Sequence, residues 1–442
     1  MTKDEVIKKK IAFISLGCDK NTVDSEKMMF LLSNNGFEFT TDISQAEIAI
    51  INTCAFIQSS KQESMNKILE VAGYKTQKLE KLIITGCMSQ RYYDEVKQIE
   101  QVDEVVRIKN NPNIVNIVFG LFGLTDIQNK KIKSLDRILS TPSHYAFLKI
   151  ADGCNNFCSY CTIPFIRGRY KSVPMECLIN EAKYLAKSGV KELILVAQDV
   201  TNYGADLYGK PELVDLLKEL SKIKGIEWIR LHYCYPHLIT DELLNEISSN
   251  PKICKYLDIP LQHISNNILA SMNRKDTKES ITSLLDKIAL LPTKISIRST
   301  FIVGYPGERT RDFNELIEFL KKYRLDNVGF FTYSREKNTK AYKMSHQIFE
   351  FVKKSRLRKI EKVQSQIMLE NQQAKVGKTL NCICEELIES ENGIFVYQMR
   401  NEYNSVDVDT YTFVSTQNRL QIGGFYPVKI TGTQGIDLVG EI

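Results

Sequence analysis

Three apolar, β-branched runs near the start of the chain each end in a cysteine and lead into a stretch with helical periodicity. The runs IAFISLGC, AEIAIINTC and KLIITGC end at Cys18, Cys54 and Cys87. Each is typical of a buried parallel strand, and stretches such as 24–34 and 59–72 are expected to follow as helices. Because the carboxyl ends of parallel strands meet at one edge of an open α/β sheet, the pattern brings the three cysteines to the same edge. A lone cysteine there is usually a small core residue, but three equivalent positions favour a shared site.

A second alternation of strands and helices begins near Tyr145. The expected strands are YAFLKIA, KELILVA, EWIRLHY, KYLDIPL, ISIRSTFIV and NVGFFTY, and the helical stretches between them begin near Met175, Pro211, Thr240, Thr277 and Arg311. Six βα units with short connections predict a partial or complete parallel barrel whose chemistry lies at the carboxyl ends of its strands.

The chain changes character after Lys375. Short alternating runs such as TLNCICEEL, GIFVYQMR and YPVKITGT are separated by Gly and Asn, a pattern typical of a small OB-like β-barrel. We therefore expect an α/β protein with an N-terminal three-cysteine domain at 1–140, a parallel βα barrel with a connecting helix at 141–374, and a small β-barrel at 375–442.

Composition narrows the class of protein. The 442 residues are 43% hydrophobic and 25% charged, which is ordinary globular usage, and no apolar run approaches the roughly 20 residues that span a bilayer. The start, MTKDEVIKKK, is polar and lacks the apolar core of a secretory signal. A cytoplasmic protein without a membrane segment is expected, and in that compartment eleven cysteines favour metal ligation over disulfides.

Charge is unevenly distributed along the chain. The net charge of +6 is too small to indicate nucleic-acid binding. The central domain carries 35 basic and 26 acidic residues, whereas residues 375–442 carry 5 and 9. Ten basic and three acidic residues lie between Arg335 and Lys362, largely in a predicted long helix, and a solvated connecting helix is the simplest explanation of that excess.

The densest signal is a C-x3-C-x2-C run formed by Cys154, Cys158 and Cys161, directly after the first predicted barrel strand. Three thiolates within eight residues suit an iron–sulfur cubane that keeps one iron without a protein ligand. A structural zinc site is the alternative, but it needs a fourth Cys or His at matching spacing, and the nearest downstream histidine is His232.

This run, with an aromatic residue before its last cysteine, resembles the radical S-adenosylmethionine (SAM) enzymes. Together with the three-cysteine domain and the small β-barrel, the whole chain resembles the methylthiotransferases, whose domains are called UPF/MTTase, radical SAM and TRAM. Segments such as SLGCDKNTVDSE, LDIPLQHISNNILASMNR and TFIVGYPGE resemble the branch that modifies an aspartate of a ribosomal protein. Asp19 stands where that branch often has Pro, and the loop GCNNFCSYCTIPFIRGR shares features with the tRNA-modifying, MiaB-like branch.

The resemblance implies two 4Fe-4S clusters, SAM and an electron donor. Cys154, Cys158 and Cys161 would hold the cluster that cleaves SAM, and Cys18, Cys54 and Cys87 an auxiliary cluster whose open iron carries the sulfur for transfer. The implied reaction replaces a β-carbon hydrogen of one aspartate, in the twelfth protein of the small ribosomal subunit, with a methylthio group. Methylthiolation of a tRNA adenosine, and an iron–sulfur module without catalysis, are the alternatives.

By the same resemblance, six further positions in the cysteine loop or toward the ends of barrel strands are expected to line the SAM pocket. Gln198 and Asp199 would receive the methionyl amine, and the guanidinium of Arg298 matches a carboxylate, with an internal ion pair as its alternative. Gly304 would allow close approach of adenine. The set is Tyr160 through its backbone, Gln198, Asp199, Gln262, Arg298 and Gly304.

The sign of the C-terminal charge predicts the macromolecular partner. Nine acidic against five basic residues in 375–442 should repel a phosphate backbone and attract a basic ribosomal protein. We therefore expect the TRAM domain to contact the protein substrate, and tRNA only under the alternative. A solvated acidic face that contacts nothing would explain the same composition.

Overall fold

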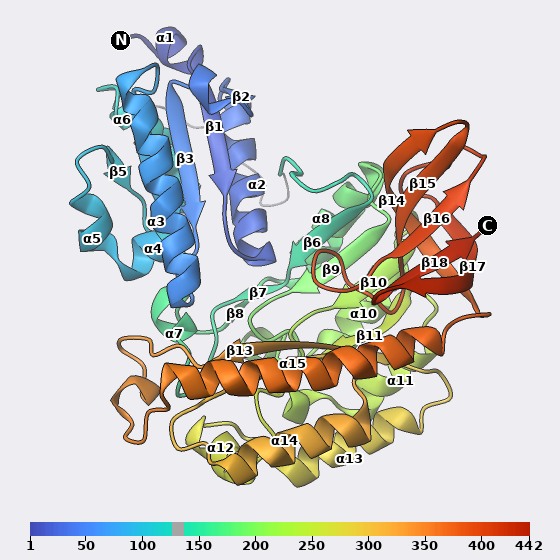
Figure 1. Cartoon of the computed structure of the whole chain (residues 1–442). Helices are drawn as coiled ribbons and strands as arrows, with labels where there is room; N and C mark the ends of the chain where they lie inside the picture. Colours follow the sequence, from blue (N-terminus) through green and yellow to red (C-terminus); the bar gives the residue numbers. More distant parts are fainter. Residues whose placement is uncertain (126–136) are drawn as a thin grey trace.

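The computed structural model of the protein describes residues 1–125 and 137–442, in which three β-structures follow one another along the chain (Figure 1). A parallel sheet comes first, a larger parallel sheet second and a closed β-barrel last. No helix in these ranges is both long and apolar enough to cross a membrane.

The first sheet has the strand order β2-β1-β3-β4-β5, and all of its pairings are parallel. Alternate residues of the wholly buried β3 enter different cores: Ile48 and Ile50 pack on one face, and Ala49 and Ile51 on the other. Helices therefore cover both faces, as a run of continuous hydrophobicity requires. The strands are β1 (Lys10–Ser15), β2 (Glu38–Thr40), β3 (Ile48–Thr53), β4 (Lys81–Gly86) and β5 (Glu104–Val105), and the helices are α1 (Lys3–Ile7), α2 (Asp19–Asn34), α3 (Gln58–Ala72), α4 (Cys87–Arg91), α5 (Tyr93–Lys97) and α6 (Ile114–Gly120).

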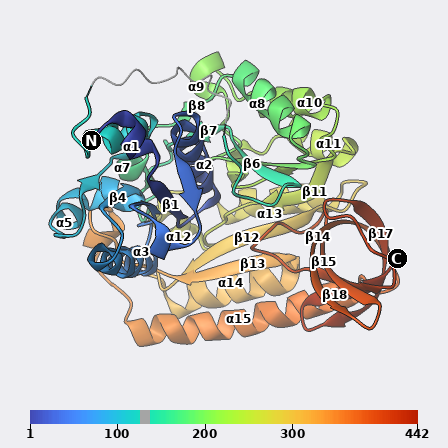
Figure 2. The ribbon, with the colours of Figure 1, turned by 90° about the horizontal axis from the view of Figure 1, so that it is seen from above.

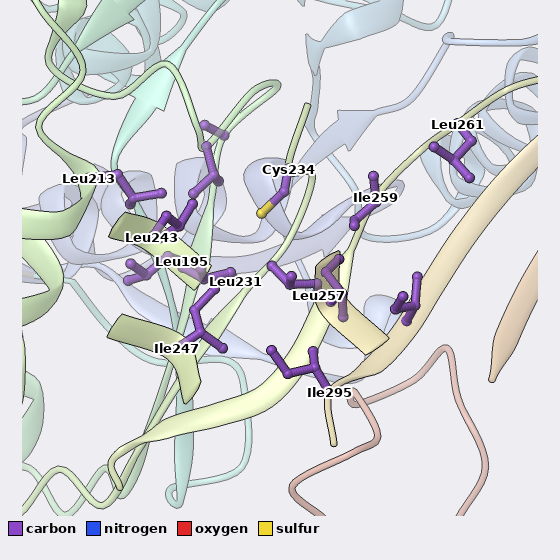
Figure 3. Close-up of a cluster of buried hydrophobic side chains, with 14 of the residues drawn as sticks. Leu195, Leu213, Leu231, Cys234, Leu243, Ile247, Leu257, Ile259, Leu261 and Ile295 are labelled. Carbon is purple, nitrogen blue, oxygen red and sulfur yellow. The ribbon is translucent and has the colours of Figure 1, made fainter. Parts of the chain in front are cut away.

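The second sheet contains the six strands expected from the sequence, in the order β6-β9-β10-β11-β12-β13, all parallel. It stays open in the described residues, so the barrel is partial. Leu195, Leu231 and Leu257, from three neighbouring strands, meet helix residues such as Leu213, Leu243 and Ile247 in the core (Figure 3). The strands are β6 (Tyr145–Lys149), β9 (Glu192–Val196), β10 (Trp228–Leu231), β11 (Ile253–Asp258), β12 (Ser296–Val303) and β13 (Asn327–Thr332).

Helices of the central domain follow the strands as predicted. They are α7 (Ile163–Ile166), α8 (Met175–Lys187), α9 (Ala205–Tyr208), α10 (Leu213–Ser221), α11 (Asp241–Ser249), α12 (Asn266–Ser271), α13 (Lys278–Ala289), α14 (Thr310–Tyr323) and α15 (Glu350–Gln373). A small antiparallel pair, β7 (Ala151–Asp152) with β8 (Lys171–Ser172), brackets the C-x3-C-x2-C loop. The long helix α15 packs along β13 and α14 at one edge of the molecule (Figure 2).

The last five strands close into a barrel with the order β14-β15-β16-β18-β17, which confirms the small β-barrel. Cys382 and Cys384 point into its core beside Met399 and Val414. The strands are β14 (Thr379–Glu391), β15 (Ile394–Asn401), β16 (Thr412–Thr416), β17 (Phe425–Gln434) and β18 (Asp437–Glu441).

A buried charge cluster fastens this barrel to the central sheet. The Glu192 carboxylate, at the start of β9, accepts a hydrogen bond of 2.7 Å from Arg230 Nε and is held on its other side by Arg400 of β15. All three side chains are fully buried. The two arginines hold the pKa of Glu192 at about 2, against the cost of burial.

Candidate functional site

Cys18, Cys54 and Cys87 follow β1, β3 and β4 at the carboxyl edge of the first sheet. This edge includes the topological switch point, because β2 and β3 lie on opposite sides of β1. Gly17 adopts φ +94°, and a Cβ added there would lie 2.7 Å from the Cβ of Cys54. The glycine therefore lets the loop before Cys18 approach the next strand. Cys18 is the N-cap of the sixteen-residue helix α2, so the positive end of the helix dipole faces the group that the thiol would bind.

Asn21 ties the three cysteine loops together. Its Nδ2 donates to the carbonyl oxygens of Leu16 and Thr53, at 2.9 and 3.0 Å, and the Cys87 thiol donates to its Oδ1 at 3.8 Å. One buried amide thus contacts the loops after β1, β3 and β4. The structure brings these three cysteines together, as the strand pattern predicted.

The second cysteine triad follows β7 in one tight loop. Backbone N–H groups of Asn156 and Ile163 each donate to a cysteine sulfur at 3.4 Å, to Cys154 and Cys161 respectively. Cys158 Sγ lies 3.7 Å from the phenolic oxygen of Tyr235. Donors aimed at sulfur favour thiolate ligands, and this loop supplies two from its own backbone.

Without a bound metal group, burial favours the neutral form of four of these thiols. It raises the pKa of Cys154 to about 11, that of Cys87 to about 12, and those of Cys54 and Cys161 above the ordinary thiol value. Neighbouring cysteines of the same triad raise these pKa values further, since each disfavours a second thiolate beside it. Buried neutral thiols are poor nucleophiles, and a cationic metal group is what reverses that preference.

Arg167, the residue after α7, links the segment that follows the second triad to the site of the first. Its Nη1 contacts Asp24 of α2 at 2.6 Å and Asp152 of β7 at 3.1 Å. Its Nη2 donates to Asn21 Oδ1 and lies 4.0 Å from Cys87 Sγ. The buried guanidinium therefore fixes the segment that follows the Cys154–Cys161 loop directly against the Cys18, Cys54 and Cys87 site.

Gln198 and Asp199 follow β9 and line the cysteine loop. Gln198 Nε2 donates to Asp152 Oδ1 at 3.0 Å, while its Oε1 is buried without a hydrogen-bond partner among the described residues. Asp199 accepts from Asn156 Nδ2 at 2.8 Å, and burial nevertheless raises its pKa. An unpaired buried acceptor beside a buried carboxylate suits a cationic amine.

Tyr160 and Gln262 also lie at this edge. The Tyr160 ring packs edge-on to Tyr305 with centroids 6.5 Å apart. Gln262 pairs with Phe301 across β12 and has φ +71°, an uncommon backbone conformation for a residue other than glycine that often marks a functional site.

Arg298 and Gly304 have protein partners in this structure. Arg298 Nη1 lies 2.5 Å from Asp409 Oδ1 and donates to the Val408 carbonyl at 2.9 Å, so its ion pair crosses to the C-terminal barrel. At Gly304 an added Cβ would meet Lys353 Cγ at 2.3 Å. The close approach that this glycine allows is therefore that of α15.

Several residues that touch the cysteine loops were not singled out from the sequence. They share polar side chains that contact a segment distant in the sequence: Asn21, Asp24, Arg167, Tyr235 and Arg274. Asn21 and Asp24 stand in the segment SLGCDKNTVDSE, Arg274 ends LDIPLQHISNNILASMNR, and Arg167 lies in the loop GCNNFCSYCTIPFIRGR. Those motifs were recognised from the sequence, but the contacts of the individual side chains needed the tertiary structure.

The arrangement differs from a single-ion site. Among the described residues no three His, Cys, Asp or Glu side chains converge closely enough to hold one metal ion, whereas a cluster spreads its ligands over several atoms. Two surface hollows, of about 490 and 680 Å³, lie away from both triads, one beside Arg137 and α8 and the other between β10 and β17.

An open barrel of parallel strands with a three-cysteine loop after its first strand defines a radical SAM protein. A family model described as the radical SAM superfamily matches residues 148–320, Uncharacterized protein family UPF0004 matches 10–107, and the TRAM domain matches 376–442. The fold is similar to that of the radical SAM methyltransferase TsrM from Kitasatospora setae, solved with cobalamin and a [4Fe-4S] cluster bound. That match has a TM-score of 0.56 at 12% identity and covers 73% of this chain and 75% of that one.

Two relatives make the family specific. The ribosomal protein uS12 methylthiotransferase RimO of Acetivibrio thermocellus is 45% identical over 450 residues, which covers 99% of each chain. The protein of the same name from Clostridium botulinum is 46% identical over 444 residues and 98% of each chain. The chain belongs to this family of radical SAM methylthiotransferases.

Proposed function

We propose that this chain replaces a β-carbon hydrogen of one aspartate of ribosomal protein uS12 with a methylthio group, using SAM as methyl donor and radical source. The observation that carries the proposal is the contact of Arg167, from the segment after the second triad, with Cys87 of the first, in a chain whose full-length relatives are named uS12 methylthiotransferases. Those names favour a ribosomal protein over the tRNA alternative. A ribosomal substrate places the reaction in the cytoplasm.

The enzyme uses two 4Fe-4S clusters and SAM, and we assign the ligands from the geometry above. Cys154, Cys158 and Cys161 would hold the radical-generating cluster, since their loop already aims backbone donors at two of the sulfurs. When bound, that cluster supplies the electron that splits SAM to a 5′-deoxyadenosyl radical, which abstracts hydrogen from an unactivated carbon. The residues of the loop hold and orient it.

The auxiliary cluster would be held by Cys18, Cys54 and Cys87. The fit rests on their common edge, on the Asn21 amide that links their loops, and on the helix N-terminus at Cys18. Three thiolates leave one iron for the exogenous sulfur that is transferred. Arg167 adds a fixed positive charge beside Cys87 and holds this site against the barrel.

For SAM we propose Gln198 and Asp199 as the receptors of the methionyl amine, with Tyr160 and Gln262 nearby. The unpaired Gln198 Oε1 supports this assignment. Arg298 and Gly304 would act there only by giving up the contacts to Asp409 and Lys353 described above. We propose the same ranges for the three domains as the sequence indicates: 1–140, 141–374 and 375–442.

We propose the β14–β15 hairpin of the TRAM domain as the contact for uS12. Glu386, Glu389 and Glu391 are exposed there, next to the half-exposed Leu387 and Ile388. Glu385 is not part of this surface, because Arg400 holds it at 2.9 Å. An acidic, partly apolar hairpin suits a basic protein substrate.

The test is mass spectrometry of uS12 and of tRNA from cells with and without the gene. The expected result is loss of the methylthio group from uS12 with tRNA unchanged. Loss of a tRNA methylthioadenosine, with uS12 unaffected, would contradict the proposal. In vitro, Glu386→Lys, Glu389→Lys and Glu391→Lys together should raise the KM for uS12 about tenfold or more without changing SAM cleavage, whereas Glu361→Lys on α15 is the matched control.

A further inference from the structure

The segment between β13 and α15 lies directly on the C-x3-C-x2-C loop. The Ala341 N–H donates to the Ser159 carbonyl at 2.8 Å, between Cys158 and Cys161 in sequence. Gln347 Nε2 donates back to the Ala341 carbonyl at 3.0 Å, which folds this segment onto itself. The outer surface of this segment is therefore a short route from solvent to the radical-generating site.

The basic excess of 335–362 is displayed on this surface rather than used internally. Lys353 and Arg356 point inward, to Tyr333 and Glu308, and Glu336 is buried against Arg91. The remaining lysines and Arg358 are exposed, and none pairs with a carboxylate of residues 1–125 or 137–442: Lys337, Lys340, Lys343, Lys354, Arg358, Lys359 and Lys362.

Two exposed aromatic rings lie within the same segment. Phe349 and Phe351 are 73% and 72% exposed, and their rings stack with centroids 5.9 Å apart and planes at 16°. Phe349 immediately precedes α15 and Phe351 is its second residue, between Lys343 and Lys354 in the sequence. An apolar centre with a charged rim is the usual composition of a protein interface.

The reaction itself requires an electron donor. Each reductive cleavage of SAM consumes one electron, which breaks a carbon–sulfur bond to give methionine and the 5′-deoxyadenosyl radical, while the carrier is oxidised by one electron. Beyond the cysteine loop, Arg167 contacts Asp24 and the Cys87 side of the auxiliary triad, and under the proposed function the protein substrate approaches between the two triads. A basic surface would also repel a basic ribosomal protein.

We propose that Lys337, Lys340, Lys343, Phe349, Phe351 and Lys354 form a donor patch that docks an acidic one-electron carrier protein. The lysines steer the carrier by charge, and the stacked phenylalanines give it an apolar contact close to the cysteine loop. Such encounters are small and transient, with affinity that falls steeply with salt. The inference rests on the proposed function, because it supplies that reaction with its electron.

The test uses the full-length, reconstituted enzyme and an acidic flavodoxin in its hydroquinone state. Lys340→Glu, Lys343→Glu and Lys354→Glu are combined in one variant, and Phe349→Ser with Phe351→Ser in another. The matched control reverses three exposed lysines near α8 and α10, at the opposite edge of the barrel from α15 (Figures 1 and 2), which form no ion pair with residues 1–125 or 137–442: Lys183, Lys187 and Lys224. Each protein is assayed for 5′-deoxyadenosine with flavodoxin and, separately, with dithionite.

The expected result separates docking from chemistry. Both patch variants should raise the KM for flavodoxin about tenfold or more, and weaken binding of labelled flavodoxin in fluorescence anisotropy, while dithionite supports cleavage at the wild-type rate. The control variant should match wild type with both reductants. Unchanged flavodoxin binding and KM in the patch variants would overturn the proposal, as would loss of binding only to a labelled small-subunit RNA hairpin. A failure of the proposed function would instead appear as SAM cleavage without modification of uS12 in wild type.

Discussion

Replacing Glu192 with glutamine should release the C-terminal barrel from the central sheet under conditions in which wild type stays assembled. The carboxylate contacts Arg230 of its own domain and Arg400 of the other, and no part of any of the three side chains reaches solvent. Glutamine keeps the shape and one acceptor oxygen but leaves the buried Arg230 without a counterion and Arg400 with Glu385 alone.

The pKa shift of Glu192 and the usual cost of breaking a buried ion pair give similar values for the stability that the substitution should lose. The pKa of Glu192 falls from an ordinary 4.5 to about 2, and at about 1.4 kcal/mol per tenfold change in proton affinity, the folded protein favours the carboxylate by about 3 kcal/mol net of the cost of burial. Removal of one partner from a buried ion pair typically costs about 3–5 kcal/mol. We therefore expect a loss of about 3 kcal/mol.

The chain carries its own reporter of this interface. Trp228 is the single tryptophan, and its ring meets Phe425 of the C-terminal barrel edge-on, with centroids 4.8 Å apart. With a urea slope of about 1–3 kcal/mol per molar, the loss should move the Trp228 fluorescence transition down by about 1 M or more. Glu227→Gln, at the exposed neighbouring carboxylate, is the control.

The sign of the pH dependence gives a second check on the same variant. Because the folded-state pKa of Glu192 lies below the unfolded value, its contribution is present above about pH 4.5 and is lost as pH falls toward 2. Wild type should therefore lose its advantage over Glu192→Gln in that window. A variant with the wild-type urea transition near neutral pH would refute the argument that this ion cluster holds the two domains together.

Three further predictions concern the cysteine triads, Arg167 and Glu308. Reconstituted wild type should bind about eight irons in an iron assay, and replacing either triad with alanine should leave about four. The variant of Cys18, Cys54 and Cys87 should still cleave SAM, whereas the variant of Cys154, Cys158 and Cys161 should not. A full iron load in either variant would contradict the ligand assignment. Arg167→Lys keeps the charge but not the fork, so the ratio of 5′-deoxyadenosine to methylthiolated uS12 should rise, with Arg169→Lys as control and an unchanged ratio as the contrary result. Burial raises the pKa of Glu308 to about 7, so thermal stability should fall as pH rises from about 4.5 to 7, and Glu308→Gln should abolish that slope; an identical slope would exclude Glu308 as its source.

The strands were predictable because both parallel sheets are buried on two faces, which leaves continuous apolar runs in the sequence. All six central strands and the three cysteine-ended strands lie where those runs indicated. The short edge strands β2 and β5 were not expected: EFT and EV carry polar residues, and their pairing with β1 and β4 is a tertiary event. Whether the central barrel closes was also beyond the sequence, because closure depends on the tilt and twist of strands and not on their apolar content.

The same distinction between local sequence patterns and tertiary contacts applies to the residues of the site. Cysteine positions follow from spacing and from the rule that parallel strands end at one edge, so both triads are predictable from the amino-acid sequence alone. Arg298 could not be placed in this way, because its partner Asp409 lies more than a hundred residues away in another domain, and a guanidinium on a strand looks the same whether it waits for a ligand or is already paired. Arg167 shows the converse: it stands beside the cysteine motif in the sequence, yet its contact with Cys87 depends on how two domains meet. Residues that couple the two clusters are therefore the ones that only the assembled chain defines, and substitutions at Arg167 should separate SAM cleavage from sulfur transfer more cleanly than any change within either triad.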